Sequence, residues 1–112
     1  MTALPITSVA TVLTAAERLR VDAAGEGLYR SLHRDSVQDV ARDVREARAA
    51  AVVLSVSCCE RGAAEPVAMM VREFPRVPTL AILSELGPRT TQTLLLLGTS
   101  GVRRLIDVRD SS

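Results

Sequence analysis

The sequence contains no lysine, because all 14 of its Lys and Arg residues are arginines. This absence excludes any mechanism that needs a lysine amine. Tryptophan is also absent, and Tyr29 and Phe74 are the only aromatic residues, although 47% of the residues are hydrophobic. The core must therefore be built from Val, Leu, Ile and Ala. Such a core is typical of buried parallel strands covered by amphipathic helices.

The chain also lacks a strong net charge. Its 14 basic and 13 acidic residues leave a net charge of +1, which provides no electrostatic footprint for nucleic acid. We therefore expect no direct nucleic-acid binding by this segment. No apolar run reaches membrane-spanning length and no signal peptide is visible, so we expect a cytoplasmic protein without membrane contact.

Cysteine is scarce, and its placement is informative. Cys58 and Cys59 are the only two and are adjacent. Neighbouring cysteines rarely bridge each other because the ring would be strained, and two cysteines make no disulfide framework. This usage favours a reducing compartment. The length of 112 residues predicts a single domain over 1–112.

The strongest structural signal is the apolar run over residues 50–57, which predicts a strand buried on both faces. A helix is predicted before it, with Ser36 as its N-cap. Apolar residues recur at helical spacing on one side, and charged residues cover the other. The apolar side consists of Val37, Val40, Ala41, Val44 and Ala47; the charged side consists of Asp39, Arg42, Asp43, Arg45, Glu46 and Arg48.

The N-terminal part predicts a strand over residues 5–13 and then a helix. Thr14 and Glu17 have the spacing of a capping box, in which each side chain bonds the other's backbone N–H. Gly25 and Gly27 predict the end of this helix. We expect Ala16, Leu19 and Ala23 to face inward and Glu17, Arg18 and Arg20 to face outward.

The remaining elements follow in alternation. The charged segment 28–33 suits an edge strand. Residues 58–64 are predicted as a connection, followed by a helix with Pro66 in its first turn and Pro75 after its end. Strands are predicted over 79–83 and 102–108, separated by a helix that opens at Gly87 and contains four consecutive leucines.

This order of five strands and four helices predicts an α/β fold, with a doubly wound, flavodoxin-like parallel sheet of order 2-1-3-4-5. The final helix that this architecture normally adds after the fifth strand is missing. Part of one sheet face would then lie open, and no helix can turn all four leucines of 94–97 toward one sheet. Because open apolar surfaces usually mark contacts, we expect a homodimer, a fragment of a longer protein, or both.

Three segments, 27–36, 71–78 and 101–104, resemble response-regulator receiver domains. More narrowly, they resemble the receiver-like N-terminal region of some actinobacterial helix-turn-helix regulators of the AraC type. The resemblance implies a cytoplasmic transcription regulator with a separate DNA-binding output domain. No helix-turn-helix is visible here, so this segment would be the regulatory part.

The resemblance also implies a phosphorylation site, but most of its parts do not match. A receiver needs a carboxylate pair after the first strand to hold Mg²⁺, where this chain has Leu13, Thr14 and Ala15. It needs an aspartate at the end of the third strand, where this chain has Ser55 and Ser57. We therefore expect neither phosphorylation nor any other enzymatic activity, and predict no metal and no cofactor.

The other two receiver positions lie at the ends of the fourth and fifth strands. Ser84 matches the hydroxyl expected after the fourth strand, and Asp107 lies where a lysine is expected. Ser55, Ser57, Ser84 and Asp107 are predicted to cluster at the strand ends. Two interpretations remain open: a crevice that binds a small polar ligand, or a filled relict of the phosphorylation pocket.

The cysteines leave a similar choice. Cys58 and Cys59 follow the central strand, so they are either a thiol sensor, or a soft-metal site with His33, or two small loop residues. The first hypothesis for function is thus a non-catalytic regulatory or dimerisation module. The second is a sensor that binds a ligand or a thiol-reactive species.

Overall fold

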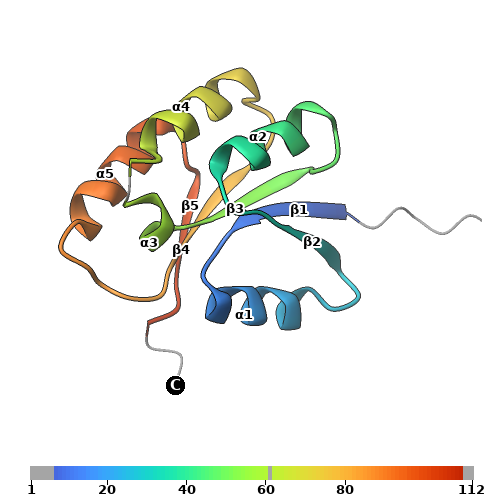
Figure 1. Ribbon diagram of the computed structural model, residues 1–112, viewed down its shortest axis with the longest axis horizontal. Helices are drawn as coiled ribbons and strands as arrows, with labels where there is room; N and C mark the ends of the chain where they lie inside the picture. Colours follow the sequence, from blue (N-terminus) through green and yellow to red (C-terminus); the bar gives the residue numbers. More distant parts are fainter. Residues whose placement is uncertain (1–6, 61, 110–112) are drawn as a thin grey trace, which may run out of the picture.

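In the computed structural model, which describes residues 7–60 and 62–109, helices flank a five-stranded sheet (Figure 1). All strand pairs are parallel, as predicted. In spatial order the strands are β2 (Tyr29–His33), β1 (Thr7–Val12), β3 (Ala51–Ser55), β4 (Thr79–Leu83) and β5 (Arg104–Asp107). The helices are α1 (Ala15–Gly25), α2 (Val37–Arg45), α3 (Val56–Cys59), α4 (Ala64–Glu73) and α5 (Thr90–Ser100).

The apolar run forms the middle strand, as expected from its lack of charge. Val52 and Leu54 in β3 are completely buried. The strand ends at Ser55, however, and not at residue 57. The Ser55 hydroxyl accepts a hydrogen bond from the Cys58 N–H at 3.4 Å and so caps α3. The predicted connection 58–64 therefore begins inside a short helix.

The two faces of the sheet are covered unequally. Figure 1 shows α2, α3, α4 and α5 on one face and α1 alone on the other. We call the first the crowded face and the second the α1 face. The crowded face holds the larger core, including Ala10, Val40, Val52, Leu54, Val67, Ala81 and Leu97. The α1 face holds a smaller cluster of Val9, Leu13, Val21, Val53 and Ile82.

The capping box at the start of α1 is confirmed, but the predicted inward face is wrong. Thr14 and Glu17 make both hydrogen bonds of the box. Leu19 is 74% exposed, whereas Glu17 is 1% exposed; Ala16 and Ala23 are also exposed. The box turns Glu17 back over the strand ends, and this fixes the rotation of the helix. The residues that follow Glu17 at four-residue spacing, Val21 and Gly25, are therefore buried with it.

Helix α2 begins after Ser36 as predicted, but one residue of its charged side is buried. Asp43 is 1% exposed. Its carboxylate accepts hydrogen bonds from Arg34 at 2.6 and 3.1 Å and from Arg48 at 3.0 Å. Burial opposes ionisation of Asp43, but the two guanidinium groups outweigh it and hold its pKa below the ordinary value. Pairing with arginines thus permits a carboxylate where the pattern predicts solvent.

The four consecutive leucines lie in the helix before β5, and their side chains differ in exposure. Helix α5 begins at Thr90, later than Gly87. Leu97 is 1% exposed, while Leu95 and Leu96 face solvent. No helix follows β5 within the described residues, which end at 109. Among residues 7–60 and 62–109, no helix has the length and apolar character needed to cross a membrane.

Candidate functional site

A buried carboxylate lies at the carboxyl ends of the central strands. Glu17 reaches from the first turn of α1 to the end of β4, where its Oε2 accepts a hydrogen bond from the Ser84 hydroxyl at 2.6 Å. Its Oε1 accepts one from the Thr14 backbone N–H at 2.8 Å. The Ser55 hydroxyl, at the end of β3, also helps to lower the pKa of this carboxyl. Neutral polar groups of Thr14, Ser55 and Ser84 thus act on one charge.

These donors control the ionisation of Glu17. Burial on its own would raise the pKa of this carboxyl. The hydrogen bonds from Ser84, the Thr14 backbone and Ser55 together outweigh burial, and they lower the pKa below its ordinary value of 4.5. Glu17 is therefore a carboxylate at neutral pH, with both oxygens occupied by donors.

The four residues predicted to cluster are distributed over three environments. Ser55 and Ser84 come together on Glu17. Ser57 instead lies in the first turn of α3 and lines a neighbouring crevice. Asp107 is exposed at the end of β5, where its carboxylate accepts hydrogen bonds from Arg109 at 2.7 to 3.2 Å. Arg109 lowers the pKa of Asp107 to about 2.

The two cysteines have different surroundings. Cys59 is 3% exposed, and burial raises the pKa of its thiol to about 12. A thiol with such a pKa is a weak nucleophile, since the thiolate is the reactive form. Cys58 is partly exposed and lines the same crevice as Ser57.

His33 is held by other partners than the cysteines. Its Nδ1 lies 2.5 Å from the Thr11 hydroxyl and its Nε2 lies 2.8 Å from the Asp22 carboxylate. A hydroxyl, an imidazole and a carboxylate in this order have the arrangement of a hydrolase triad. Thr11 is completely buried, so its hydroxyl cannot meet a substrate. Within residues 7–60 and 62–109, no three His, Cys, Asp or Glu residues converge as a metal site would require.

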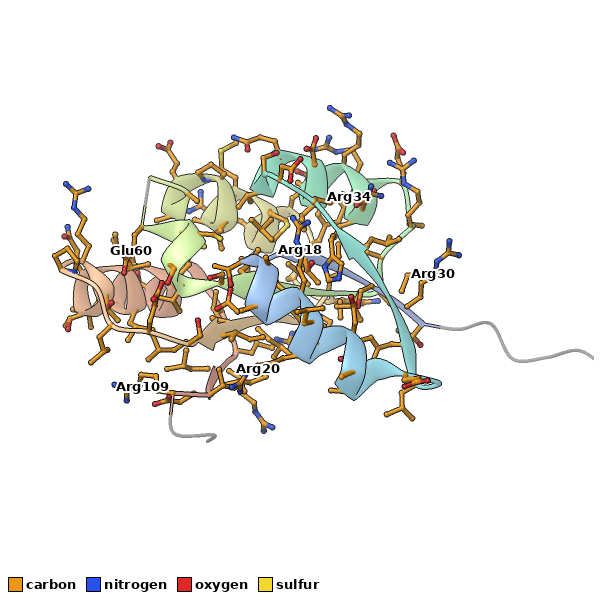
Figure 2. All side chains as sticks on the ribbon, turned by 60° about the horizontal axis from the view of Figure 1, so that its bottom comes forward. Arg18, Arg20, Arg30, Arg34, Glu60 and Arg109 are labelled. Carbon is orange, nitrogen blue, oxygen red and sulfur yellow. The ribbon has the colours of Figure 1, made fainter. Side chains whose placement is uncertain are left out.

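A crevice of about 630 Å³ opens beside the Glu17 cluster. It lies where β1 and β3 end, between the turns that lead into α1, α2 and α4. Arg18 and Arg34 both line it, and Figure 2 shows the two residues close together, with Arg18 Nη2 3.3 Å from the Arg34 carbonyl oxygen. The remaining lining is Val12, Leu13, Thr14, Asp35, Ser36, Val37, Gln38, Ser57, Cys58, Gly62, Ala63, Pro66 and Glu85.

Solved structures with the same fold are response-regulator receivers and their relatives. A response regulator from Thermotoga maritima superposes with a TM-score of 0.71 at 14% identity, covering 92% of this chain and 85% of that one. The CheY-like protein TadZ from Pseudomonas aeruginosa gives 0.72 at 14% identity, with 90% and 86% covered. The chemotaxis protein CheY4 from Vibrio cholerae gives 0.67 at 15% identity, with 92% and 87% covered.

The chain therefore has a receiver-like fold, akin to that of response regulators. At these identities the likeness establishes the fold alone. No family model matches the sequence, and no curated protein is significantly similar to it. Function must consequently be argued from the chain's own residues.

Sequence reasoning missed two features of this region. It assigned Glu17 to capping and solvent, although the residue also bonds Ser84, 67 positions away. It placed Arg18 on the outer face, although Arg18 lines the crevice. The available signal for the burial of Glu17 was a carboxylate in a capping box immediately after a strand. No local signal indicated that Arg18 lines the crevice.

Proposed function

We propose that this domain is a non-catalytic regulatory module of a transcription regulator, and that it works without phosphorylation. The observation that carries this proposal is the position of Glu17. Its carboxylate fills the strand-end site between Ser84 and Ser55, and the end of β3 carries a serine where a receiver needs its aspartate.

The geometry gives a physical reason for expecting no phosphoryl transfer. A divalent cation prefers several oxygen ligands, usually including more than one carboxylate in receiver-type sites. Here both oxygens of Glu17 already accept short hydrogen bonds, at 2.8 and 2.6 Å. A cation would have to break these bonds, and the end of β3 offers a serine hydroxyl, which is a weaker nucleophile than the carboxylate of a receiver. The site is therefore held in one state by hydrogen bonds.

Phosphotransfer tests this directly. The domain is incubated with Mg²⁺ and acetyl phosphate, and its intact mass is measured. We expect no mass increase, for the wild type and for Glu17→Gln alike. A receiver domain of known activity, treated in parallel, controls for the donor. A mass increase of one phosphoryl group on the wild type would contradict the proposal.

The output side of the proposal concerns self-association and a DNA-binding partner. Ile106 is 38% exposed and pairs in register with Ile82, so it extends the apolar cluster of the α1 face toward solvent. We propose that the domain forms a homodimer and regulates an AraC-type helix-turn-helix domain encoded in the same reading frame. Light scattering at high micromolar concentration should give a dimer mass; a monomer would contradict self-association. Sequencing the reading frame past residue 112 should reveal the output domain.

A ligand sensor is the second candidate function. The crevice beside Glu17 favours it, because its volume and its position at the strand ends suit a small molecule. Thiol sensing is the weaker form of this candidate, since burial raises the pKa of Cys59 to about 12. Cys58 in the crevice wall would act as a contact residue.

A further inference from the structure

The crevice occupies the topological switch point of the sheet. The chain leaves β1 through Leu13 and Thr14 toward α1 on one face, and leaves β3 through Ser57 and Cys58 toward the other face. Both pairs of residues line the crevice. Open α/β sheets bind ligands at this kind of divergence. The volume of about 630 Å³ is in the range of ligand pockets, roughly 300 to 1,000 Å³.

Arg18 supplies a weakly bonded guanidinium at this crevice, with its side chain 36% exposed. Its Nε is buried and has no hydrogen-bond partner among the described residues. Its Nη2 makes only long contacts, at 3.3 Å to the Arg34 carbonyl and 3.4 Å to the Asp35 carboxylate. The Asp35 side chain is 96% exposed, so water competes for that contact. Burial keeps Nε itself out of reach from the crevice, but Nη2 can exchange its two long contacts for a stronger acceptor, because hydrogen bonds between two charged groups are shorter and stronger.

The other charged residues of the lining do not neutralise the Arg18 guanidinium. Arg34 is held by the buried Asp43 through two hydrogen bonds. Asp35 and Glu85 are exposed at the rim, where solvent and salt screen them. Inside the crevice the field is therefore set by the Arg18 guanidinium, whose planar fork matches the two oxygens of a carboxylate or phosphate.

The walls limit what can carry that oxyanion. Leu13, Val37 and Pro66 give the crevice apolar surface beside the polar groups. We propose that the crevice binds a small organic acid. Its carboxylate or phosphate would accept hydrogen bonds from the Nη atoms of Arg18, and its apolar part would pack against Val37 and Pro66. This inference rests on the second candidate function and is independent of the role of Glu17.

The probes separate the two sources of the oxyanion and the contribution of the apolar walls. The isotope-labelled domain is titrated with hexanoate, phenyl phosphate and inorganic phosphate, and amide shifts are followed by NMR. We expect hexanoate or phenyl phosphate to shift the amides of Arg18, Ser57 and Cys58. Hexanoate alone would assign a carboxylate, and phenyl phosphate alone a phosphate monoester. No shift at these amides with any probe at millimolar concentration would overturn the proposal.

Variants connect the binding to Arg18. Arg18→Gln should weaken the organic probe at least tenfold, or about 1.4 kcal/mol. Arg20→Gln, the same change on the same helix outside the crevice lining, should leave affinity unchanged.

Ser57→Leu, which fills the crevice from the opposite wall, should also abolish binding, and it tests the site if Arg18→Gln does not fold. Unchanged affinity in a folded Arg18→Gln or Ser57→Leu variant would overturn the site. Equal affinity for phenyl phosphate and inorganic phosphate would overturn the organic ligand. None of these failures would affect the phosphotransfer result.

Discussion

The two faces of the sheet are held together by different chemistry. On the crowded face, helices contribute aliphatic side chains such as Val40, Val67 and Leu97, all nearly or fully buried. On the α1 face the single helix buries Glu17, Val21 and Gly25, only one of which has a large apolar side chain. Its first turn is anchored by the hydrogen bonds that the Glu17 carboxylate accepts from the Ser84 hydroxyl and the Thr14 N–H. A single helix can thus be positioned by a buried polar link where its apolar contact is limited.

The largest effect should come from the crowded face. Leu54→Ala removes a completely buried side chain from the larger core, in a region enclosed by helices that cannot collapse freely. We expect a loss of roughly 2–5 kcal/mol in the free energy of unfolding, measured by urea denaturation. A loss below about 1 kcal/mol would show that this core is loosely packed and would remove the contrast between the faces.

The next effect tests the polar link of the α1 face. Glu17→Gln keeps the size of the side chain but replaces the charged acceptor by a neutral amide, whose hydrogen bonds to Ser84 and the Thr14 N–H are weaker. We expect a loss of roughly 1–3 kcal/mol, and weaker protection of the α1 amides in hydrogen exchange. Ser84→Ala should reproduce part of the loss. A neutral Glu17→Gln variant would show that the link does not position α1.

The difference in stability between the wild type and Glu17→Gln should depend on pH. The pKa of Glu17 is lowered in the folded state, so its contribution to stability is present above the unfolded value of 4.5 and is lost as pH falls through the folded pKa. The stability difference between wild type and Glu17→Gln should therefore be constant near neutrality and shrink below pH 4.5. Asp43 and Asp107, whose pKa values are also lowered, titrate in both proteins and cancel in the difference. A difference that does not shrink in acid would contradict the ionised, hydrogen-bonded Glu17.

A matched pair on one strand compares the faces most directly. Val52 and Val53 are neighbours in β3 with 0% and 8% exposure, and they belong to the crowded and α1 clusters respectively. We expect Val52→Ala to cost about 2 kcal/mol and Val53→Ala about 1 kcal/mol, because a cavity near the thinner cover can close more easily. Equal losses, measured by the same denaturation, would mean that the α1 face is packed as tightly as the other.

The smallest effect concerns the exposed side of α1. Leu19→Gln exchanges residues of similar helix propensity at a position that is 74% exposed. We expect a change within about 0.5 kcal/mol in dilute protein. If the proposed homodimer covers this side chain, the variant should instead lower the dimer mass fraction at high concentration, which light scattering would detect.

Sequence patterns predicted some local elements closely. The strand over 79–83 begins and ends where it was expected, because a short β-branched and aliphatic run between turns has one reasonable assignment. The capping residues Thr14 and Ser36 were found because their partners are three positions away. The predicted exposure of Glu17 and Asp43 was wrong, because their partners, Ser84 and Arg34, come from other elements.

Hydrophobic spacing was enough to predict the alternation of strands and helices, the central place of β3 and the edge place of β2, because it is a local property that burial enforces. The sequence also excluded lysine chemistry and a carboxylate at the end of β3. The folded chain was needed to show which charged groups are buried, which of the predicted serines meet, and that an arginine with an unsatisfied Nε lines a crevice. Those outcomes depend on contacts between residues distant in the chain, which no local pattern encodes.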